Sequence, residues 1–355
     1  MRRKRSARSL NATSSFATAR CTAATRCGDS SVWSASSRSD PRAALPRQTI
    51  PRYLRDLEQS LGKTMPMPHQ PIAPAVPGPA AYAEDFVEID GLRLRLQDYG
   101  TPGRPPMLCL HGGAANAHWY DFVAGAFNAD YHVRAVDLRG HGDSDWDPSS
   151  TPNYDYRRHA ADIHELTEKL DLRDFILVGH SMGGMISILY ASTYPGRAKA
   201  LVVVDSNLVM TPERIAGFNA VYERQGRDYA SQEEFIASYR VRPGGSTAPA
   251  EALRHIARHS GRRFEDGRWR HKVDRRVYAN RELFDSLALW DGIRIPTLLM
   301  KGGRSVRMAP EAIEEVRRRA PQVKLTVVPD ADHHITLDNP AGFIRAARDF
   351  LAEIA

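Results

Sequence analysis

Cysteine and long apolar runs are both scarce in this sequence. Its 355 residues include only three cysteines, Cys21, Cys27 and Cys109, which are too few for a disulfide framework and favour a reducing compartment. No stretch approaches the roughly 18 to 20 consecutive apolar residues of a membrane span. There is no GxGxxG turn and no group of histidines at zinc-binding spacing, so we expect neither a cofactor nor a metal. The prediction is a cytoplasmic protein with no membrane partner.

Most of the chain also lacks an excess of positive or negative charge. The formal net charge is +7, but residues 1–50 alone hold ten Lys or Arg against two Asp. The rest of the chain is therefore close to neutral. This balance argues against a nucleic-acid partner, and a small-molecule substrate is expected instead. The oligomeric state stays open.

Residues 1–80 lack the hydrophobic periodicity of a packed domain. They are rich first in Ser, Ala, Thr and Arg and then in Pro, and they cannot bury enough apolar surface to offset the entropy lost on ordering. We predict a disordered, basic and Pro-rich extension with one short helix over 53–61. Two origins stay open for its first part: an organellar transit peptide, or sequence upstream of a true start at Met65 or Met67, which is favoured.

Removing residues 1–64 is expected to leave catalytic activity and melting temperature unchanged, because that segment adds nothing to a packed core. Activity assays and thermal unfolding of the truncated and full-length chains test this. A fall in either quantity would show that the extension belongs to the folded protein.

Short apolar runs alternate with helical stretches beyond the extension. Most of these runs are apolar throughout rather than alternately apolar and polar, as in parallel strands covered on both faces. They occupy 107–110, 132–136, 175–178, 200–204, 297–300 and 323–328. Helical patterns occupy 156–170, 185–194 and 340–354. Asp90-Gly91 between two alternating segments predicts an initial hairpin. The order predicts a mostly parallel α/β sheet flanked by helices.

This alternation is interrupted once, between Asp205 and Trp290. The residues there carry helical periods and no convincing core strand, which predicts a helical lid over 207–290 between two parts of the core, 81–206 and 291–355. Trp269 and Trp290 are predicted to wall a pocket under this lid. The lid holds fourteen Arg and one Lys against eleven acidic residues. We interpret this basic excess as a solvated helical face rather than as a means of steering a charged substrate.

The pentapeptide Gly179-His180-Ser181-Met182-Gly183 lies between an apolar run and a helical stretch. A serine between glycines at a strand-to-helix turn is typical of a hydrolase nucleophile, because the sharp turn requires small neighbours. The new helix directs its free N–H groups and positive dipole end at the place where an oxyanion would form. Ser181 is therefore the candidate nucleophile, and the backbone N–H of Met182 is a candidate oxyanion donor.

A second oxyanion donor is expected in the loop His111-Gly112-Gly113 after an earlier apolar run. Gly113 is the favoured residue. His118 and Trp119 follow this loop and are candidate substrate-binding residues, although burial in the core fits Trp119 equally well.

These motifs together resemble the α/β-hydrolase superfamily, especially its branch of epoxide hydrolases, haloalkane dehalogenases, haloperoxidases, lactonases and carbon–carbon bond hydrolases. The resemblance covers about residues 84–355. It rests on His111-Gly112-Gly113, on residues 137–144, which we interpret as structural, on Gly179 to Gly183, and on His333 with Asn339-Pro340. It implies an α/β-hydrolase fold with a helical lid after the sixth strand, and no cofactor. Ser181 argues against epoxide hydrolases and dehalogenases, which use Asp at the elbow.

The resemblance also implies a histidine base after the last strand and a carboxylate that orients it. Two adjacent histidines follow that strand; we favour His333 over His334 from its spacing to Asp338 and Pro340. The usual loop for the acid has no Asp near Val306. A minority of the enzymes that this chain resembles place the acid after the sixth strand, where Asp205 stands, so Asp205 is the favoured acid. A turn-capping Asp205 and a dyad of Ser181 and His333 are the alternatives.

The expected function is a serine hydrolase that cleaves a small-molecule ester, lactone or activated carbon–carbon bond through an acyl-enzyme on Ser181. Two alternatives stay open. One is an enzyme of another class on the same scaffold, such as a haloperoxidase-like oxidoreductase or a lyase. The other is a ligand-binding protein with slow turnover, which the missing acid near Val306 favours and the intact elbow disfavours.

Overall fold

The computed structural model describes residues 78–223, 226–279 and 284–355. The expected helix over 53–61, the Pro-rich stretch before residue 78, both proposed start codons and two of the cysteines lie outside the described residues. Cys109 lies within them and is buried in the core, as expected. No helix in the described part of the chain is both long and apolar enough to cross a membrane.

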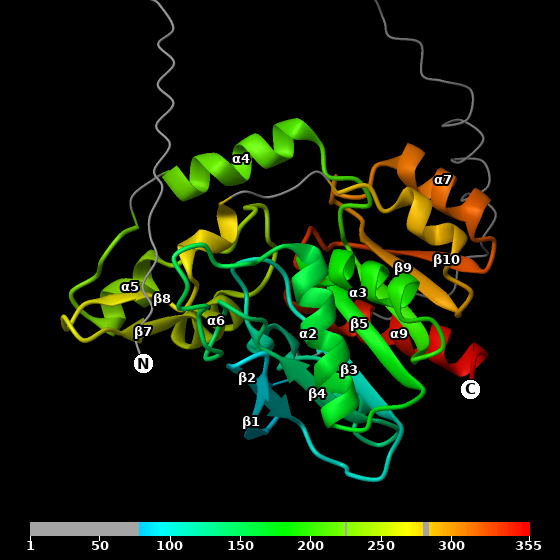
Figure 1. The fold of residues 1–355 in the computed structure, drawn as a ribbon, viewed down its shortest axis with the longest axis horizontal. Coiled ribbons are helices and arrows are strands. Elements are labelled where there is room, and N and C mark those ends of the chain that lie inside the picture. The colour runs from blue at the N-terminus through cyan, green and yellow to red at the C-terminus, as the bar shows by residue number, and fades with distance from the viewer. Residues whose placement is uncertain (1–77, 224–225, 280–283) are drawn as a thin grey trace, which may run out of the picture. The chain divides into compact units, whose positions relative to one another are not determined.

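Eight strands form one sheet in the order β1-β2-β4-β3-β5-β6-β9-β10 (Figure 1). The strands are β1 (Ala83–Ile89), β2 (Leu92–Asp98), β3 (Pro106–Leu110), β4 (His132–Val136), β5 (Phe175–His180), β6 (Ala198–Val204), β9 (Thr297–Gly302) and β10 (Val323–Val328). The first two are antiparallel to each other, β2 is antiparallel to β4, and every pair from β4 to β10 is parallel. Each apolar run expected to be a strand is one.

The initial hairpin turns at Asp90 and Gly91, as its sequence predicts. Both residues have positive φ, 51° and 72°. A two-residue turn with positive φ at both positions matches the twist of the flanking strands, and Asp-Gly adopts it at little cost. The hairpin register follows, with Ile89 opposite Leu92.

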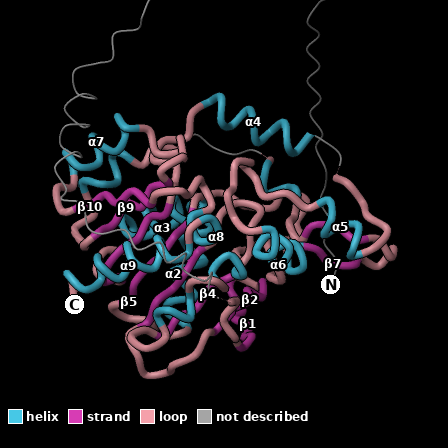
Figure 2. The backbone as a smooth tube through the Cα atoms, turned by 180° about the vertical axis from the view of Figure 1, so that it is seen from behind, coloured by secondary structure: helices cyan, strands magenta, loops and turns pink. Residues whose placement is uncertain are grey.

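Helices cover both faces of the sheet, and an apolar cluster fills each interface. One cluster contains residues of α2 (Tyr156–Lys169), α3 (Met182–Thr193) and α7 (Pro310–Arg319). The other contains residues of α8 (Ile335–Asp338) and α9 (Pro340–Glu353). The opposite views of Figures 1 and 2 show α2 and α3 in front of the sheet in one and α9 in front in the other. The three expected helices are α2, α3 and α9.

The segment between β6 and β9, residues 207–296 and called the insert below, stands apart from this layering. It contains α4 (Pro212–Glu223), α5 (Gln232–Ser238), α6 (Ala250–Ser260), β7 (Gly261–Arg263), β8 (Trp269–His271) and the short helices η3 (Arg275–Tyr278) and η4 (Leu287–Asp291). Within it, β7 and β8 pair as a two-stranded ribbon, and Trp269 of β8 also forms an isolated antiparallel bridge with Tyr229. Trp290, in η4 of the insert, is fully buried in the apolar cluster that contains α3 and α7 and does not line the cavity above Ser181, contrary to the prediction.

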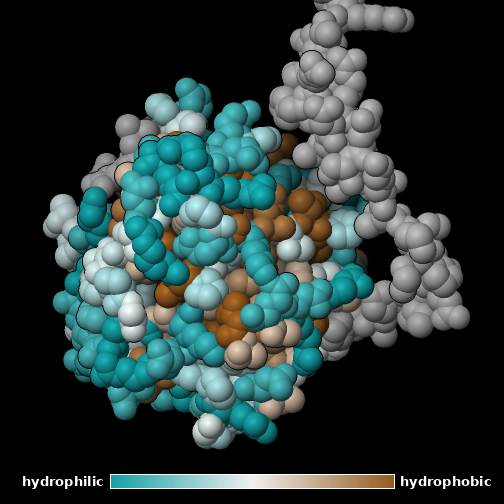
Figure 3. Space-filling view, turned by 90° about the vertical axis from the view of Figure 1, so that its right-hand side faces the viewer, coloured by the Kyte–Doolittle hydropathy of each residue, from teal (hydrophilic) through white to brown (hydrophobic). Residues whose placement is uncertain are grey.

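Figure 3 shows the side of the folded part near α7, β10 and α9. Hydrophilic residues cover most of this face, and apolar residues appear in separate patches. A folded surface always keeps some apolar atoms, so scattered patches of this kind need no partner to explain them.

Candidate active site

Ser181 occupies the turn between β5 and α3 in a strained backbone conformation, with φ of +52° and ψ of −114°. A positive φ is unfavourable for any residue other than glycine, and it persists only where the surrounding structure enforces it. The glycines on either side show why. A Cβ atom at Gly179 would overlap the carbonyl of Gly183, and one at Gly183 would overlap the carbonyls of Leu110 and His111. The sequence GHSMG is therefore the one that lets the helix begin this close to the strands.

A chain of hydrogen bonds connects Ser181, His333 and Asp205. Nε2 of His333 lies 2.9 Å from Oγ of Ser181, and Nδ1 of the same ring lies 2.8 Å from Oδ2 of Asp205. The three residues follow β5, β10 and β6 respectively. Carboxyl ends of parallel strands lie at one edge of a sheet, which brings these distant positions together. His334, the alternative base, instead places Nε2 at 3.2 Å from the carbonyl of Pro243.

Asp205 is completely buried and is surrounded by donors. Besides His333, Oδ2 accepts a hydrogen bond of 2.5 Å from the hydroxyl of Ser305, and Oδ1 accepts one of 3.1 Å from the backbone N–H of Gly302. Burial raises the pKa of Asp205, while the donors Ser305 and Gly302 oppose this shift by stabilising the charged form. Ser305 belongs to the loop in which the sequence lacks the usual acid. That loop contributes donors to a carboxylate supplied by β6.

The imidazole of His333 is held neutral by its surroundings. Burial is the main cause that lowers its pKa well below the usual value, and electrostatic repulsion by His334, Arg307 and Arg214 adds to the effect. A neutral ring can accept a proton at Nε2 while Nδ1 donates to Asp205. The buried His180 supports this position, because its Nε2 lies 2.9 Å from the backbone carbonyl of His333.

The glycine loop after β3 is fixed by the histidine that precedes it. His111 is fully buried, and its Nδ1 lies 2.7 Å from the carbonyl of Gly112. Its Nε2 accepts a hydrogen bond of 3.0 Å from the N–H of Leu138 in the next loop. Burial lowers the pKa of His111 to about 4, so the ring stays neutral and can accept that bond. Gly113 and Ser181 both line the wall of one cavity.

The segment 137–144 has the structural surroundings expected of it. Asp137 is fully buried, accepts a hydrogen bond of 2.7 Å from the N–H of Ala117, and pairs with Arg95 at 3.2 Å. It also accepts from the N–H of Asp143. These bonds connect the residues after the glycine loop to the loop after β4.

A cavity of about 720 Å³ opens above Ser181 and His333. The insert supplies most of its wall, and Trp119 and Gly113 supply part of the core side. His118 and Trp269, which the sequence suggests as substrate-binding residues, are not among the residues that line it. The cavity-lining aromatic residues, several of which the sequence analysis did not single out, are Trp119, Trp146, Tyr229, Tyr239, Phe264 and Tyr278.

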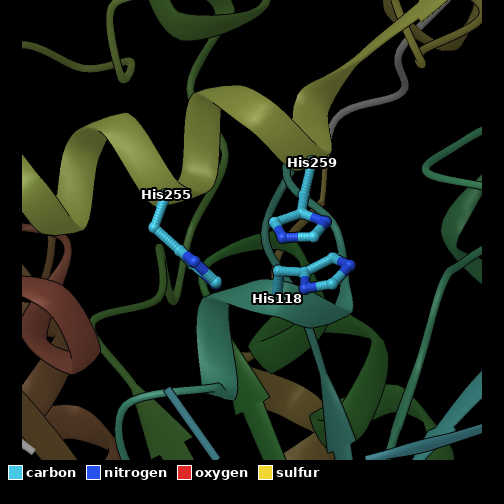
Figure 4. Close-up of side chains that lie close together, drawn as sticks. All are labelled: His118, His255 and His259. Atoms are coloured by element: carbon cyan, nitrogen blue, oxygen red, sulfur yellow. The ribbon is translucent and has the colours of Figure 1, made fainter. Parts of the chain in front are cut away.

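His118 lies instead where the insert contacts the core (Figure 4). Its ring stacks on that of His259, with centroids 3.6 Å apart and planes at 19°. The buried carboxylate of Asp121 lies 2.8 Å from Nδ1 of His118 and 2.6 Å from Nε2 of His255. His255 and His259 come from α6, and His118 comes from η1 (Ala117–Tyr120). The cluster therefore fastens α6 to the core.

Two histidine groups in the described part of the chain have nitrogens close enough to consider a metal ion. In the group of His118, His255 and His259, Asp121 occupies one nitrogen of two rings, and the nearly parallel stacked rings direct their lone pairs side by side. In the group around His333, both nitrogens of that ring are occupied by Ser181 and Asp205. Neither arrangement presents three lone pairs to one point, as a tetrahedral site requires.

Comparison with known proteins gives consistent results. A family model described as alpha/beta hydrolase fold matches residues 105–340. The chain is 30% identical over 265 residues to the sn-1-specific diacylglycerol lipase ABHD11 of Mus musculus, covering 71% of this chain and 83% of the lipase. It is 27% identical over 271 residues to the 2-(acetamidomethylene)succinate hydrolase of Mesorhizobium japonicum, covering 75% and 94%. The crystal structure of E-2-(acetamidomethylene)succinate hydrolase matches with a TM-score of 0.66 at 24% identity, over 77% of this chain and 100% of that one.

Replacing Asp205 with Asn is expected to lower kcat by about 10³- to 10⁴-fold, because an amide favours the wrong tautomer of His333. Ser305→Ala removes one donor to the same carboxylate and is expected to lower kcat by about three- to tenfold. Steady-state kinetics on an ester, with melting temperature as a control for folding, measures both. A loss under about tenfold for Asp205→Asn would assign the acid elsewhere.

Proposed function

We propose that this chain, which belongs to the alpha/beta hydrolase fold family and is a hydrolase, is a serine hydrolase that cleaves a small-molecule ester, lactone or activated carbon–carbon bond. The observation that carries the proposal is the hydrogen bond of 2.9 Å between Ser181 and His333, continued at 2.8 Å to Asp205. A nucleophile, a base and an orienting carboxylate in this order are the three groups that acyl transfer needs.

In the first half of the proposed reaction, Oγ of Ser181 attacks the substrate carbonyl carbon and its proton passes to Nε2 of His333. The resulting oxyanion accepts hydrogen bonds from the backbone N–H groups of Gly113 and Met182. Met182 begins α3, so the positive end of that helix dipole also faces the oxyanion. Each such donor is typically worth about 3 to 4 kcal/mol in the transition state.

In the second half, His333 gives its proton to the leaving group, and an acyl-enzyme on Ser181 remains. Water then donates a proton to the same nitrogen and attacks the acyl carbon. Collapse of the second tetrahedral intermediate releases the acid product and returns the proton to Ser181. Asp205 stays ionised throughout and keeps Nδ1 of His333 protonated.

The relatives support carbonyl chemistry without naming one substrate. One is named as a diacylglycerol lipase and another as a hydrolase of a substituted succinate. Both names describe attack on a carbonyl-containing small molecule or lipid. We propose that the insert acts as the lid that selects among such substrates, because it supplies most of the cavity wall.

A short-chain 4-nitrophenyl ester is expected to release a burst of nitrophenolate, because acylation of Ser181 precedes slower hydrolysis of the acyl-enzyme. Stopped-flow absorbance measures the burst, and a fluorophosphonate probe measures covalent labelling. Ser181→Ala should remove both signals, whereas Ser192→Ala, on the same helix, provides a matched control. Absence of burst and labelling in the unaltered protein would favour the ligand-binding alternative.

The lowered pKa of His333 predicts a pH profile. The ring acts as a base only when neutral, and a pKa below the usual 6.5 keeps it neutral in weakly acidic solution. The value of kcat/KM for a neutral ester should therefore stay high as pH falls through 6.5 and decline only at lower pH. Kinetics between about pH 4 and pH 8 measures this, with circular dichroism as the control for folding. A half-maximal point at or above 6.5 would contradict the buried, neutral base.

A further inference from the structure

The cavity above Ser181 has an excess of positive charge. Two aspartates line it, Asp228 and Asp274. The arginines that line it are more numerous and all come from the insert: Arg227, Arg240, Arg242, Arg270, Arg275 and Arg276. A cavity of one sign, with apolar walls that exclude water, concentrates ligands of the opposite charge.

Both aspartates are already paired. Arg270 holds Asp228 through two hydrogen bonds of 2.7 and 2.8 Å. Arg276 holds Asp274 through Nε and Nη2, and Tyr154 donates to the same carboxylate at 2.7 Å. The two aspartates therefore neutralise only Arg270 and Arg276 among the six arginines that line the cavity.

Arg242 lines the cavity as an exposed residue, and its guanidinium group has neither a carboxylate nor a carbonyl partner among the described residues, 78–223, 226–279 and 284–355. Arg240, by contrast, donates to the carbonyls of Ala237 and Tyr239, and Arg227 faces Glu234 at 3.6 Å. A guanidinium group offers a planar fork of N–H donors that matches a carboxylate.

The position of Arg242 suits a group that holds the far end of a substrate. The next residue, Pro243, accepts from His334 at 3.2 Å, and His334 is the immediate neighbour of the base His333. Removal from bulk water lowers the pKa of His271 in the cavity wall to about 4, and the charge of Arg242 adds to that shift. Arg242 is therefore close enough to His271 for its charge to act on that part of the cavity wall. Apolar rings of Trp119, Trp146 and Phe264 lie in the same wall.

We propose that the substrate carries a carboxylate and that Arg242 binds it, while Ser181 attacks a carbonyl elsewhere in the same molecule. This inference rests on the proposed hydrolase function and adds the chemical class of its substrate. Arg242 is then a specificity-determining residue rather than a catalytic one. The aromatic wall accommodates the carbon skeleton between the carboxylate and the carbonyl.

The test compares two esters of the same shape, mono-4-nitrophenyl adipate and its neutral terminal carboxamide. The unaltered enzyme is expected to favour the adipate, and the preference should weaken at high salt. Arg242→Gln should lower the ratio of kcat/KM for the adipate to kcat/KM for the carboxamide by about 10- to 100-fold, because it removes a charge-assisted hydrogen bond. Arg242→Lys should keep part of the preference. Arg258→Gln makes the same charge change on an exposed part of α6 outside this cavity and should keep the full ratio.

Three results would overturn the proposal. One is an unaltered enzyme that does not distinguish the two esters. Another is an Arg242→Gln variant in which both kcat/KM values fall together, which indicates a structural role. The last is a preference lost in Arg240→Gln and kept in Arg242→Gln. Hydrolysis of the neutral carboxamide ester through Ser181 separates all three from a failure of the proposed hydrolase function.

Discussion

The hydrogen bond between Ser181 and His333 connects residues 152 positions apart, and the candidate site depends on it. Nothing local in the chain can form such a contact. It exists because β5 and β10 are parallel members of one sheet, so their carboxyl ends open at the same edge. The strained turn at Ser181 has the same origin. The strands and α3 pack so closely that the serine keeps a conformation it would otherwise avoid.

Most of the fold could be predicted from the sequence because its signals are local. A continuous apolar run between turn residues predicts a buried parallel strand, and Asp-Gly predicts the hairpin turn. The nucleophile turn is equally local, since two glycines and a serine must be adjacent. Choosing His333 over His334 needed only the spacing to Asp338 and Pro340. In the structure, that ring is the one within reach of Ser181.

The parts that sequence reasoning missed depend on partners far along the chain. Ser305 meets Asp205 across 100 positions, and a serine in a glycine-containing loop gives no sign of such a partner. His118 looks like a pocket residue because it follows the glycine loop. Its actual neighbours, His255 and His259, come from the insert. A long helical insertion has few constraints on where it docks, so its contacts cannot be read from its periodicity.

In the candidate site, the core positions the groups proposed to react, and the insert supplies most of the surface proposed to contact the substrate. The core supplies buried donors and neutral imidazoles, which hold the nucleophile and base whatever the substrate is. The insert supplies charge and aromatic surface, which can vary without disturbing the sheet.

The two parts are nevertheless coupled through the electric field in the cavity. Arg214 of the insert, together with Arg307 of the core, lowers the pKa of His333. A carboxylate of the substrate within electrostatic range of His333 would offset part of that positive field and would raise the basicity of the imidazole when it must accept a proton. A neutral ligand has no such effect. Positive charge in the insert would therefore serve the chemical step as well as binding, because the base is strengthened only when the anionic substrate is present.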